Sequence, residues 1–343
     1  VFQQFNLFNN LTVLKNLTMA PLEIAKQKRK AVRRKNMFLK IRNVFKKTGH
    51  KLPLLPPEVQ AVPGDLTDDA SLDGFFEGAG PESCVIHCAG IISIATRPAP
   101  ILRRVNVDGT ARVLAHCAAH RVKKLVYVSS VHALPEKPKG ETIAEDCRLS
   151  PELVEGGYAK TKAEAANLVF EAARQGLDAS VVFPSGIIGP GDLQSGSFTT
   201  MAKDYLRGRL PLAVRGGYDF VDVRDVADGI LACAAGGAPG EGYILSGHYT
   251  TIRGLLETVG QAAGLRRRSL YLPLWLAGLA APFYEKKTLR EKKPLFFTPY
   301  SISVLGSNGQ FSCRKAAERF GYRPRPLEET LRDMTEWLLQ NGA

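Results

Sequence analysis

A tyrosine and a lysine four residues apart are the pair of side chains in this sequence best suited to chemistry. Tyr158 and Lys162 lie in GYAKTKAEAANLV, residues 157–169, a stretch rich in good helix formers. On a helix this spacing places the phenol and the ammonium on one face, one turn apart. A nearby ammonium favours the phenolate and lowers the pKa of the phenol. The pair therefore indicates a general acid or base, although such spacing also arises by chance on helices that do no chemistry.

Alternating strands and helices from about residue 53 onward are expected to position this pair. Residues 82–90, 124–130 and 177–192 have the composition of buried strands that end in small or polar residues. The alternation predicts an α/β fold, a doubly wound parallel sheet of the Rossmann type. Ligands bind such sheets outside the carboxyl ends of the strands. The residues predicted to lie there are Asp65, Ala89, Gly90, Ser129, Ser130, Pro184 and Ser185.

Ser130, Tyr158 and Lys162, in this order, resemble the catalytic triad of the extended short-chain dehydrogenase/reductase superfamily, which includes the NAD-dependent epimerase/dehydratase family. The likeness extends over about residues 55–343. It is carried by GDLTD at 64–68, VIHCAG at 85–90, VNVDGT at 105–110 with Asn106, FPSGIIGPGD at 183–192 and FVDVRDVADG at 220–229. The C-terminal third is most similar to the dihydroflavonol reductase-like and 3β-hydroxysteroid dehydrogenase-like branches.

This resemblance implies an enzyme that uses NAD or NADP and transfers a hydride to or from a carbonyl or alcohol carbon of an apolar small molecule. Tyr158 would move the proton, Lys162 would lower its pKa and hold the nicotinamide ribose, and Ser130 would bind the substrate oxygen. Ser129 is a rival for that last role, and His132 is expected to be a loop residue. The implied cofactor contacts are Asp65, Leu66, Cys88, Ala89, Gly90, Lys162, Pro184 and Ser185.

Two other functions remain open on the sequence alone. A sugar-nucleotide epimerase or dehydratase would share the fold, but it would need Arg or Lys for a diphosphate, and none is obviously placed. A catalytically dead remnant would keep the fold and lose cofactor affinity. The substrate lobe of any of these is expected near residues 183–215 and 240–310.

The strand, glycine-rich loop and helix that open this family's fold cannot be found in the sequence. Residues 1–63 contain one glycine, Gly49, whereas a G-x-x-G-x-x-G loop holds the cofactor pyrophosphate in such folds. Residues 1–45 resemble instead the Q-loop segment of ATP-binding cassette ATPases, with Gln3 at the glutamine position. We therefore expect an atypical basic segment at 1–50, a reductase domain at 51–343, and weak dinucleotide binding.

The net charge of +13 is concentrated at one end of the chain. Residues 1–52 contain 13 Lys and Arg against one acidic residue, Glu23, so the rest of the chain is almost neutral. The basic run of that segment, KQKRKAVRRK, could form a nucleic-acid or membrane-surface patch, but a solvated helix face is favoured, and no nucleic-acid partner is expected. Six cysteines without zinc-site spacing predict no metal site and a reduced, cytoplasmic setting. The expected partner is a small-molecule substrate, with a homodimer as a further possibility.

The longest apolar stretch is LYLPLWLAGLAAPF at 270–283. It is too short to span a bilayer and contains two prolines, so no transmembrane segment is expected. It fits a helix on a membrane surface or a helix that covers the substrate. We favour the second, because an apolar lid suits an apolar alcohol or ketone.

Overall fold

The computed structural model describes residues 62–146, 149–193, 196–291 and 295–342. Two predictions therefore lie outside the described residues: the atypical segment at 1–50 and the missing strand, glycine loop and helix.

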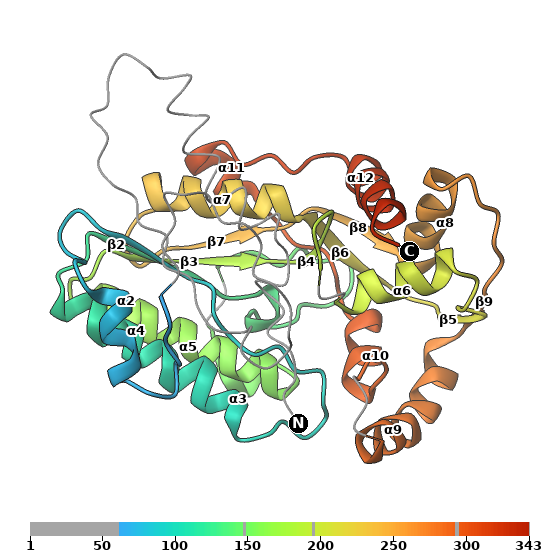
Figure 1. Ribbon diagram of the computed structural model, residues 1–343, viewed down its shortest axis with the longest axis horizontal. Helices are drawn as coiled ribbons and strands as arrows, with labels where there is room; N and C mark the ends of the chain where they lie inside the picture. Colours follow the sequence, from blue (N-terminus) through green and yellow to red (C-terminus); the bar gives the residue numbers. More distant parts are fainter. Residues whose placement is uncertain (1–61, 147–148, 194–195, 292–294, 343) are drawn as a thin grey trace.

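A parallel sheet forms the centre of the described part of the chain (Figure 1). β2, β3 and β7 are buried along their whole length, and for this reason their sequences are largely continuous apolar runs. The strand order is β1 (Cys84–His87), β2 (Lys124–Val128), β3 (Ala179–Pro184) and β7 (Gly242–Leu245), and each neighbouring pair is parallel.

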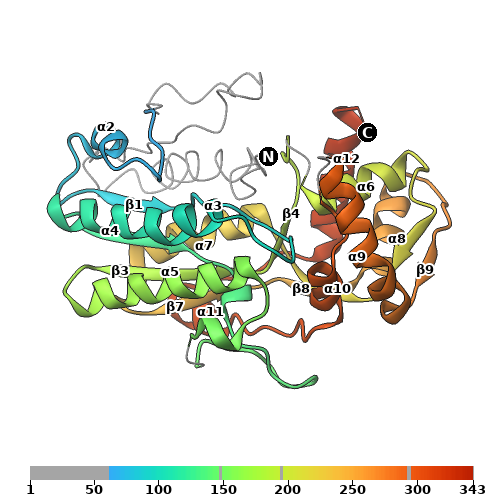
Figure 2. The same cartoon turned by 90° about the horizontal axis from the view of Figure 1, so that it is seen from below.

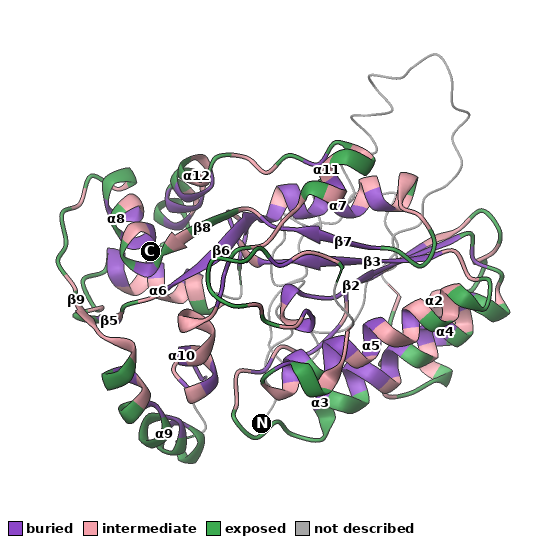
Figure 3. Ribbon diagram, turned by 180° about the vertical axis from the view of Figure 1, so that it is seen from behind, coloured by how far each residue is buried: buried purple, intermediate pink, exposed green. Residues whose placement is uncertain are grey.

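Helices cover both faces of this sheet (Figures 1 and 3). α4 (Gly109–Ala119) and α5 (Gly157–Arg174) lie on one face, and α7 (Val223–Gly236) and α11 (Arg314–Phe320) lie on the other. The predicted doubly wound α/β fold is confirmed. The part of the molecule that contains the parallel sheet also has shorter helices and turns. These are η2 (Ala70–Leu72), α2 (Asp73–Phe76), α3 (Ile101–Arg103), the π-helical turn η3 (Arg104–Asp108), η4 (Val131–Ala133) and η5 (Pro151–Leu153).

A second group of elements lies beyond the carboxyl end of β3, as Figure 2 shows from below. Its strands are β4 (Gly186–Ile188), β5 (Leu212–Val214), β6 (Gly217–Asp222), β8 (His248–Thr251) and β9 (Leu270–Leu272). β6 pairs with β4 and β8, and β5 pairs with β9. Its helices are α6 (Ser197–Leu206), α8 (Ile252–Ala262), α9 (Leu274–Arg290), α10 (Pro299–Gly306) and α12 (Leu327–Gln340).

Helix α9 corrects one prediction. Its large apolar side chains were expected to cover the substrate, but Trp275 and Phe283 are 69% and 78% exposed. The helix packs against Ile302 of α10 through the small side chains of Ala277 and Ala281, which are fully buried. Sequence could not decide this orientation, because hydrophobicity alone does not tell whether the alanines or the large apolar residues of 274–283 face inward.

Candidate active site

The ends of three strands bring most of the predicted site residues to one edge of the sheet. The register places His87 beside Tyr127, and Val128 beside Val182. The residues that follow the strands, 88–90, 129–130 and 184–185, therefore meet at the carboxyl edge, where this class of sheet binds ligands.

Helix α5 carries Tyr158 and Lys162 across this edge. The helix begins at Gly157, and both side chains lie on its buried face, as their spacing predicted. Gly156, directly before it, has a φ of 87°, a conformation that favours glycine. A Cβ at this position would lie 2.4 Å from the ring of Tyr300. The turn that precedes Tyr158 is therefore shaped by a residue of α10.

The Lys162 side chain is completely buried at the end of β2. Its Nζ donates to the carbonyl oxygen of Val128 at 2.8 Å and to the hydroxyl of Tyr127 at 3.3 Å. The same Nζ lies 4.8 Å from the centroid of the Tyr127 ring. Burial lowers the pKa of Lys162 to about 7. Near neutral pH this amine can therefore both hold and release a proton.

Burial dominates the chemistry of Tyr158, which is 5% exposed. Burial raises the pKa of its phenol, and the neighbouring Ser130 hydroxyl opposes this rise. Lys162 is not among the groups that shift the Tyr158 pKa, because its amine makes its hydrogen bonds at the end of β2. The lowering of the Tyr158 pKa by Lys162 therefore stays a prediction.

The two neighbouring serines face different partners. The Ser129 hydroxyl lies 3.4 Å from the backbone oxygen of Lys162 and is 1% exposed. The Ser130 hydroxyl accepts a hydrogen bond from the backbone N–H of His132 at 3.3 Å and interacts with the phenol of Tyr158. Of the two serines, Ser130 is the one whose hydroxyl is placed to act together with Tyr158.

His132, expected to be a plain loop residue, lies at the centre of an aromatic cluster. Its Nε2 lies 3.0 Å from the hydroxyl of Tyr218, and its Nδ1 lies 3.4 Å from the hydroxyl of Tyr300. The rings of His132 and Tyr158 are 6.1 Å apart. Burial lowers the pKa of His132 to about 4, so the ring is neutral at pH 7. No sequence signal connects these tyrosines, because they come from β6 and α10, far along the chain.

Gly90 and Asn106 close the space beside Lys162. The Asn106 side chain accepts a hydrogen bond from the backbone N–H of Ile91 at 2.7 Å and donates one to the Ile91 carbonyl at 2.9 Å. It also donates to the hydroxyl of Thr161 on α5 at 3.1 Å. A Cβ on Gly90 would lie 3.2 Å from Asn106 Oδ1 and 3.6 Å from Lys162 Nζ. A side chain at Gly90 would therefore crowd Asn106 and contact the Lys162 amine.

Asp65 and Leu66 lie in a turn packed against the start of α4. Asp65 Oδ1 accepts hydrogen bonds from the backbone N–H and the hydroxyl of Thr67, both at 2.8 Å. The Leu66 carbonyl accepts a hydrogen bond from Arg112 at 3.0 Å. Residues 62–64 are not part of a strand, and Asp65 forms an isolated bridge with Asp68. The turn is stabilised locally, so it does not depend on strand pairing.

The remaining predicted cofactor contacts are buried at the same edge. Pro184 ends β3, and Ser185 follows it with 8% exposure. The Ser185 hydroxyl makes no hydrogen bond of ordinary geometry with the described residues, although it lies close enough to the Asp219 carboxyl to oppose the rise in pKa that burial causes there. It can therefore still donate to or accept from a ligand. Cys88 is 2% exposed, and burial raises the pKa of its thiol to about 12, which keeps it protonated.

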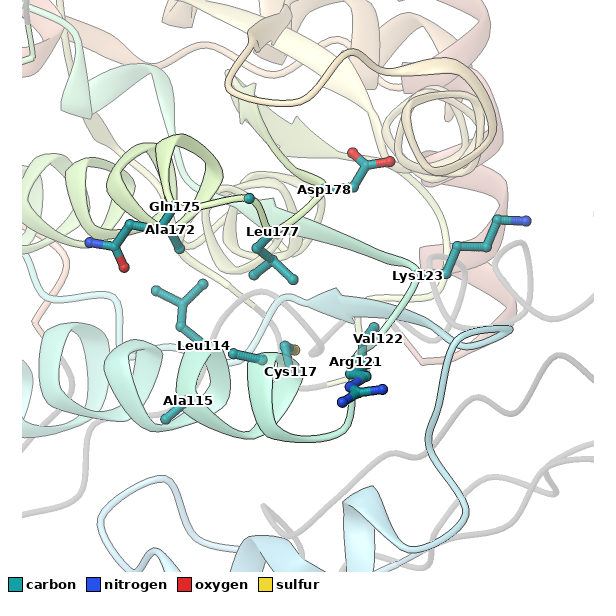
Figure 4. A pocket seen from close by; sticks show the side chains of 12 residues that line it. Leu114, Ala115, Cys117, Arg121, Val122, Lys123, Ala172, Gln175, Leu177 and Asp178 are labelled. Carbon is teal, nitrogen blue, oxygen red and sulfur yellow. The ribbon is translucent and has the colours of Figure 1, made fainter.

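The hollow drawn in Figure 4 belongs to the opposite end of the sheet. It is lined by residues at the ends of α4 and α5, including Cys117 and Gly176, and by Lys123 and Asp178, which precede β2 and β3. These are the amino ends of the strands, remote from Ser130. We therefore assign no part of the active site to it.

Comparison with known proteins places these residues in a family context. The model of the NAD dependent epimerase/dehydratase family matches residues 27–245. The match covers the strand ends and the start of α5, and it begins inside the segment predicted to be atypical. The resemblance of residues 1–45 to an ATP-binding cassette ATPase is not borne out.

Two relatives and one solved structure illustrate the similarity. Sterol demethylase protein B of Methylococcus capsulatus (strain ATCC 33009 / NCIMB 11132 / Bath) is 28% identical over 292 residues, which are 83% of this chain and 86% of the relative. The 3beta-hydroxysteroid-dehydrogenase/decarboxylase isoform 1 of Arabidopsis thaliana is 29% identical over 80% of this chain and 65% of its own length. The crystal structure of gox2253 has a TM-score of 0.73 and 25% identity, with 95% of this chain and 96% of that chain covered.

Proposed function

Because this chain belongs to the NAD-dependent epimerase/dehydratase family, we propose that it is an NAD(P)-dependent oxidoreductase that acts on a carbonyl or alcohol of an apolar small molecule. The observation that carries the proposal is the meeting of Ser130, Tyr158 and Lys162 at the carboxyl edge of a parallel sheet. The substrate lobe is proposed near residues 183–215 and 240–310.

The described residues fit the second half of a dinucleotide site. The close approach of the Gly90 backbone to Lys162 and the buried Ser185 hydroxyl, which makes no ordinary hydrogen bond with the described residues, support this fit. Asp65 and Leu66 would hold the adenine side, Lys162 the nicotinamide ribose, and Ser185 the nicotinamide. The other contacts proposed at this edge are Cys88, Ala89 and Pro184. A bound nicotinamide would supply or accept the hydride.

The residues of the chain would manage the proton and the charge on the substrate oxygen. In reduction, the Tyr158 phenol would give its proton to the oxygen as that atom gains negative charge, and in oxidation it would take the proton back. The Ser130 hydroxyl would donate a hydrogen bond to the same oxygen. Lys162, with a pKa of about 7, would stabilise the phenolate when protonated.

An apolar substrate is supported by the surroundings of Tyr158. The cluster beside it consists of aromatic rings and hydroxyls, from His132, Tyr218 and Tyr300. His132 is neutral at pH 7, so it does not offer a cation to a diphosphate. This favours an alcohol or ketone of low polarity over a sugar nucleotide. The sterol-related names of the two relatives point in the same direction.

The test is turnover of a panel of apolar secondary alcohols and ketones with NADH, NADPH and their oxidised forms. We expect Tyr158→Phe to abolish nearly all turnover and leave cofactor binding near normal. Ser130→Ala should reduce kcat on the order of 10²-fold or more, the scale for one lost hydrogen-bond donor at a developing oxyanion. Ser129→Ala is the matched control, and we expect it to retain most activity.

The same panel should be run on a chimera whose first ~50 residues are a strand, glycine loop and helix that bind dinucleotide as in doubly wound folds. Turnover that survives Tyr158→Phe would contradict the proposed proton donor. A silent Ser130→Ala combined with a damaging Ser129→Ala would reverse the roles of the two serines. Inactivity of both the chain and the chimera would favour the catalytically dead alternative.

A further inference from the structure

Helix α9 presents its large apolar side chains to the outside of the molecule. Trp275, Leu279 and Phe283 recur every four residues, so they form one stripe along the helix. They are 69%, 64% and 78% exposed. Leu276 and Tyr284 flank the stripe and are also exposed. A helix at a water-exposed surface normally packs such residues inward, so we expect a binding partner to cover this face.

The inward face of α9 is small and polar, which fixes the orientation of the helix. Ala277 and Ala281 pack against Ile302 of α10, and Glu285 is 7% exposed. The Glu285 carboxylate accepts hydrogen bonds from the backbone N–H and the hydroxyl of Thr96, at 2.8 and 2.7 Å. Rotating the helix to bury Trp275 would break these bonds and leave the carboxylate unpaired. The outward placement of the apolar stripe is therefore specified by the fold.

The same face becomes cationic in the last two turns of the helix. Lys286 and Arg290 follow Phe283 by three and seven residues, so they continue its side of the helix. With Lys287 they border a shallow depression beside Phe283. Lys287 makes a loose pair with Glu291 at 4.0 Å. Within the described part of the chain, Lys286 and Arg290 form no ion pair.

We propose that α9 is a membrane-docking surface that binds a bilayer containing anionic phospholipid. The stripe of Trp275, Leu279 and Phe283 would enter the boundary between headgroups and acyl chains. Lys286, Lys287 and Arg290 would meet the lipid phosphates. In the described residues no helix is both long enough and apolar enough to cross a bilayer, and the apolar stripe of α9 is exposed on the surface.

The pairing of apolar and cationic halves favours a bilayer over a second copy of the chain. A twofold interface through this face would bring together the same groups from both copies. In such an interface, Glu291 is the acidic residue that this end of one helix would bring to the cations of the other helix. A bilayer offers both an apolar layer and a layer of phosphates, and so it satisfies both halves of the surface at once.

The expected contributions follow from the exposed groups. Burying a large apolar side chain strengthens partitioning by roughly tenfold or more. Each cation near an anionic surface adds roughly fivefold, a contribution that salt screens. Substituting both Leu279 and Phe283 should therefore weaken binding by about 10²-fold. Reversing the charge of Lys286 and Arg290 should remove the preference for anionic lipid and leave part of the apolar affinity.

The test uses the full chain with Trp337→Phe, which leaves Trp275 as its one tryptophan and a reporter of depth. The probes are vesicles of phosphatidylcholine alone and of phosphatidylcholine with about one third phosphatidylglycerol, an anionic lipid. We expect co-flotation with the anionic vesicles, a blue shift of Trp275 emission, and quenching by brominated acyl chains. High salt should weaken the binding.

Leu279→Ser with Phe283→Ser should abolish flotation, and Lys286→Glu with Arg290→Glu should abolish the lipid preference. Leu339→Ser is the control, because Leu339 is 47% exposed on α12, outside this surface. No flotation by the parent chain, or equal loss in the Leu339→Ser variant, would overturn the proposal. The proposal would also be overturned if the chain did not bind vesicles but self-associated in a concentration-dependent way that the two serine substitutions abolished.

Discussion

Replacing Lys162 by methionine should change how the stability of the chain depends on pH. Lys162 is completely buried, and burial lowers its pKa to about 7 in the folded chain. In the unfolded chain a lysine has a pKa of about 10.4. Between these two values the unfolded chain binds more protons than the folded chain, so the free energy of unfolding rises with pH.

The size of this effect follows from the two pKa values. At about 1.4 kcal/mol per pH unit, with half of the folded-state lysine still protonated near pH 7, the contribution amounts to about 2 kcal/mol between about pH 7 and about pH 9. The buried cysteines also affect stability in this range, but they are the same in parent and variant. The difference between the two curves therefore isolates Lys162.

Urea denaturation at a series of pH values measures this difference. The parent chain should gain about 2 kcal/mol relative to Lys162→Met as the pH rises through this window. Lys160→Met is the matched control, since Lys160 lies on the same helix and is exposed. Parallel curves for the parent and Lys162→Met would refute the reasoning, because they would show that the buried amine does not titrate with a lowered pKa.

Two further predictions concern the turn before Tyr158 and the cofactor. Gly156→Ala should cost about 2–4 kcal/mol in the free energy of unfolding, since it adds backbone strain and displaces the Tyr300 ring. Gly176→Ala, at a φ of 102° with open space around it, should cost about 1 kcal/mol, and equal costs would contradict the steric argument. In calorimetry, the chain should bind NADH and NADPH roughly 10³- to 10⁶-fold more weakly than the chimera with a glycine loop, and micromolar binding by the unmodified chain would show that its first residues were misjudged.

Local spacing predicted what depends on local geometry. The placement of Tyr158 and Lys162 on one helix face follows from a four-residue interval, and it is observed at the start of α5. The gathering of Ser130 and Ser185 at one edge follows from the parallel strand order, which the alternating pattern predicted. The family resemblance added the roles of these residues, and those roles stay predictions.

Sequence could not predict contacts that join distant elements. His132 meets Tyr218 of β6 and Tyr300 of α10, and no interval in the chain relates the three. The sequence also could not predict the direction of the Lys162 amine, because it depends on the carbonyl of Val128 at the end of β2. For α9, burial of Ala277 in place of Trp275 depends on how closely α10 approaches, which hydrophobicity alone does not encode.

The contact between Tyr300 and Gly156 links access to the Tyr158 phenol with the position of that phenol. Tyr158 and Tyr300 are 5% and 6% exposed, so both phenols are buried. The same Tyr300 ring lies against Gly156, the residue directly before α5. Any movement of Tyr300 would therefore affect both the access to the Tyr158 phenol and the turn that positions it.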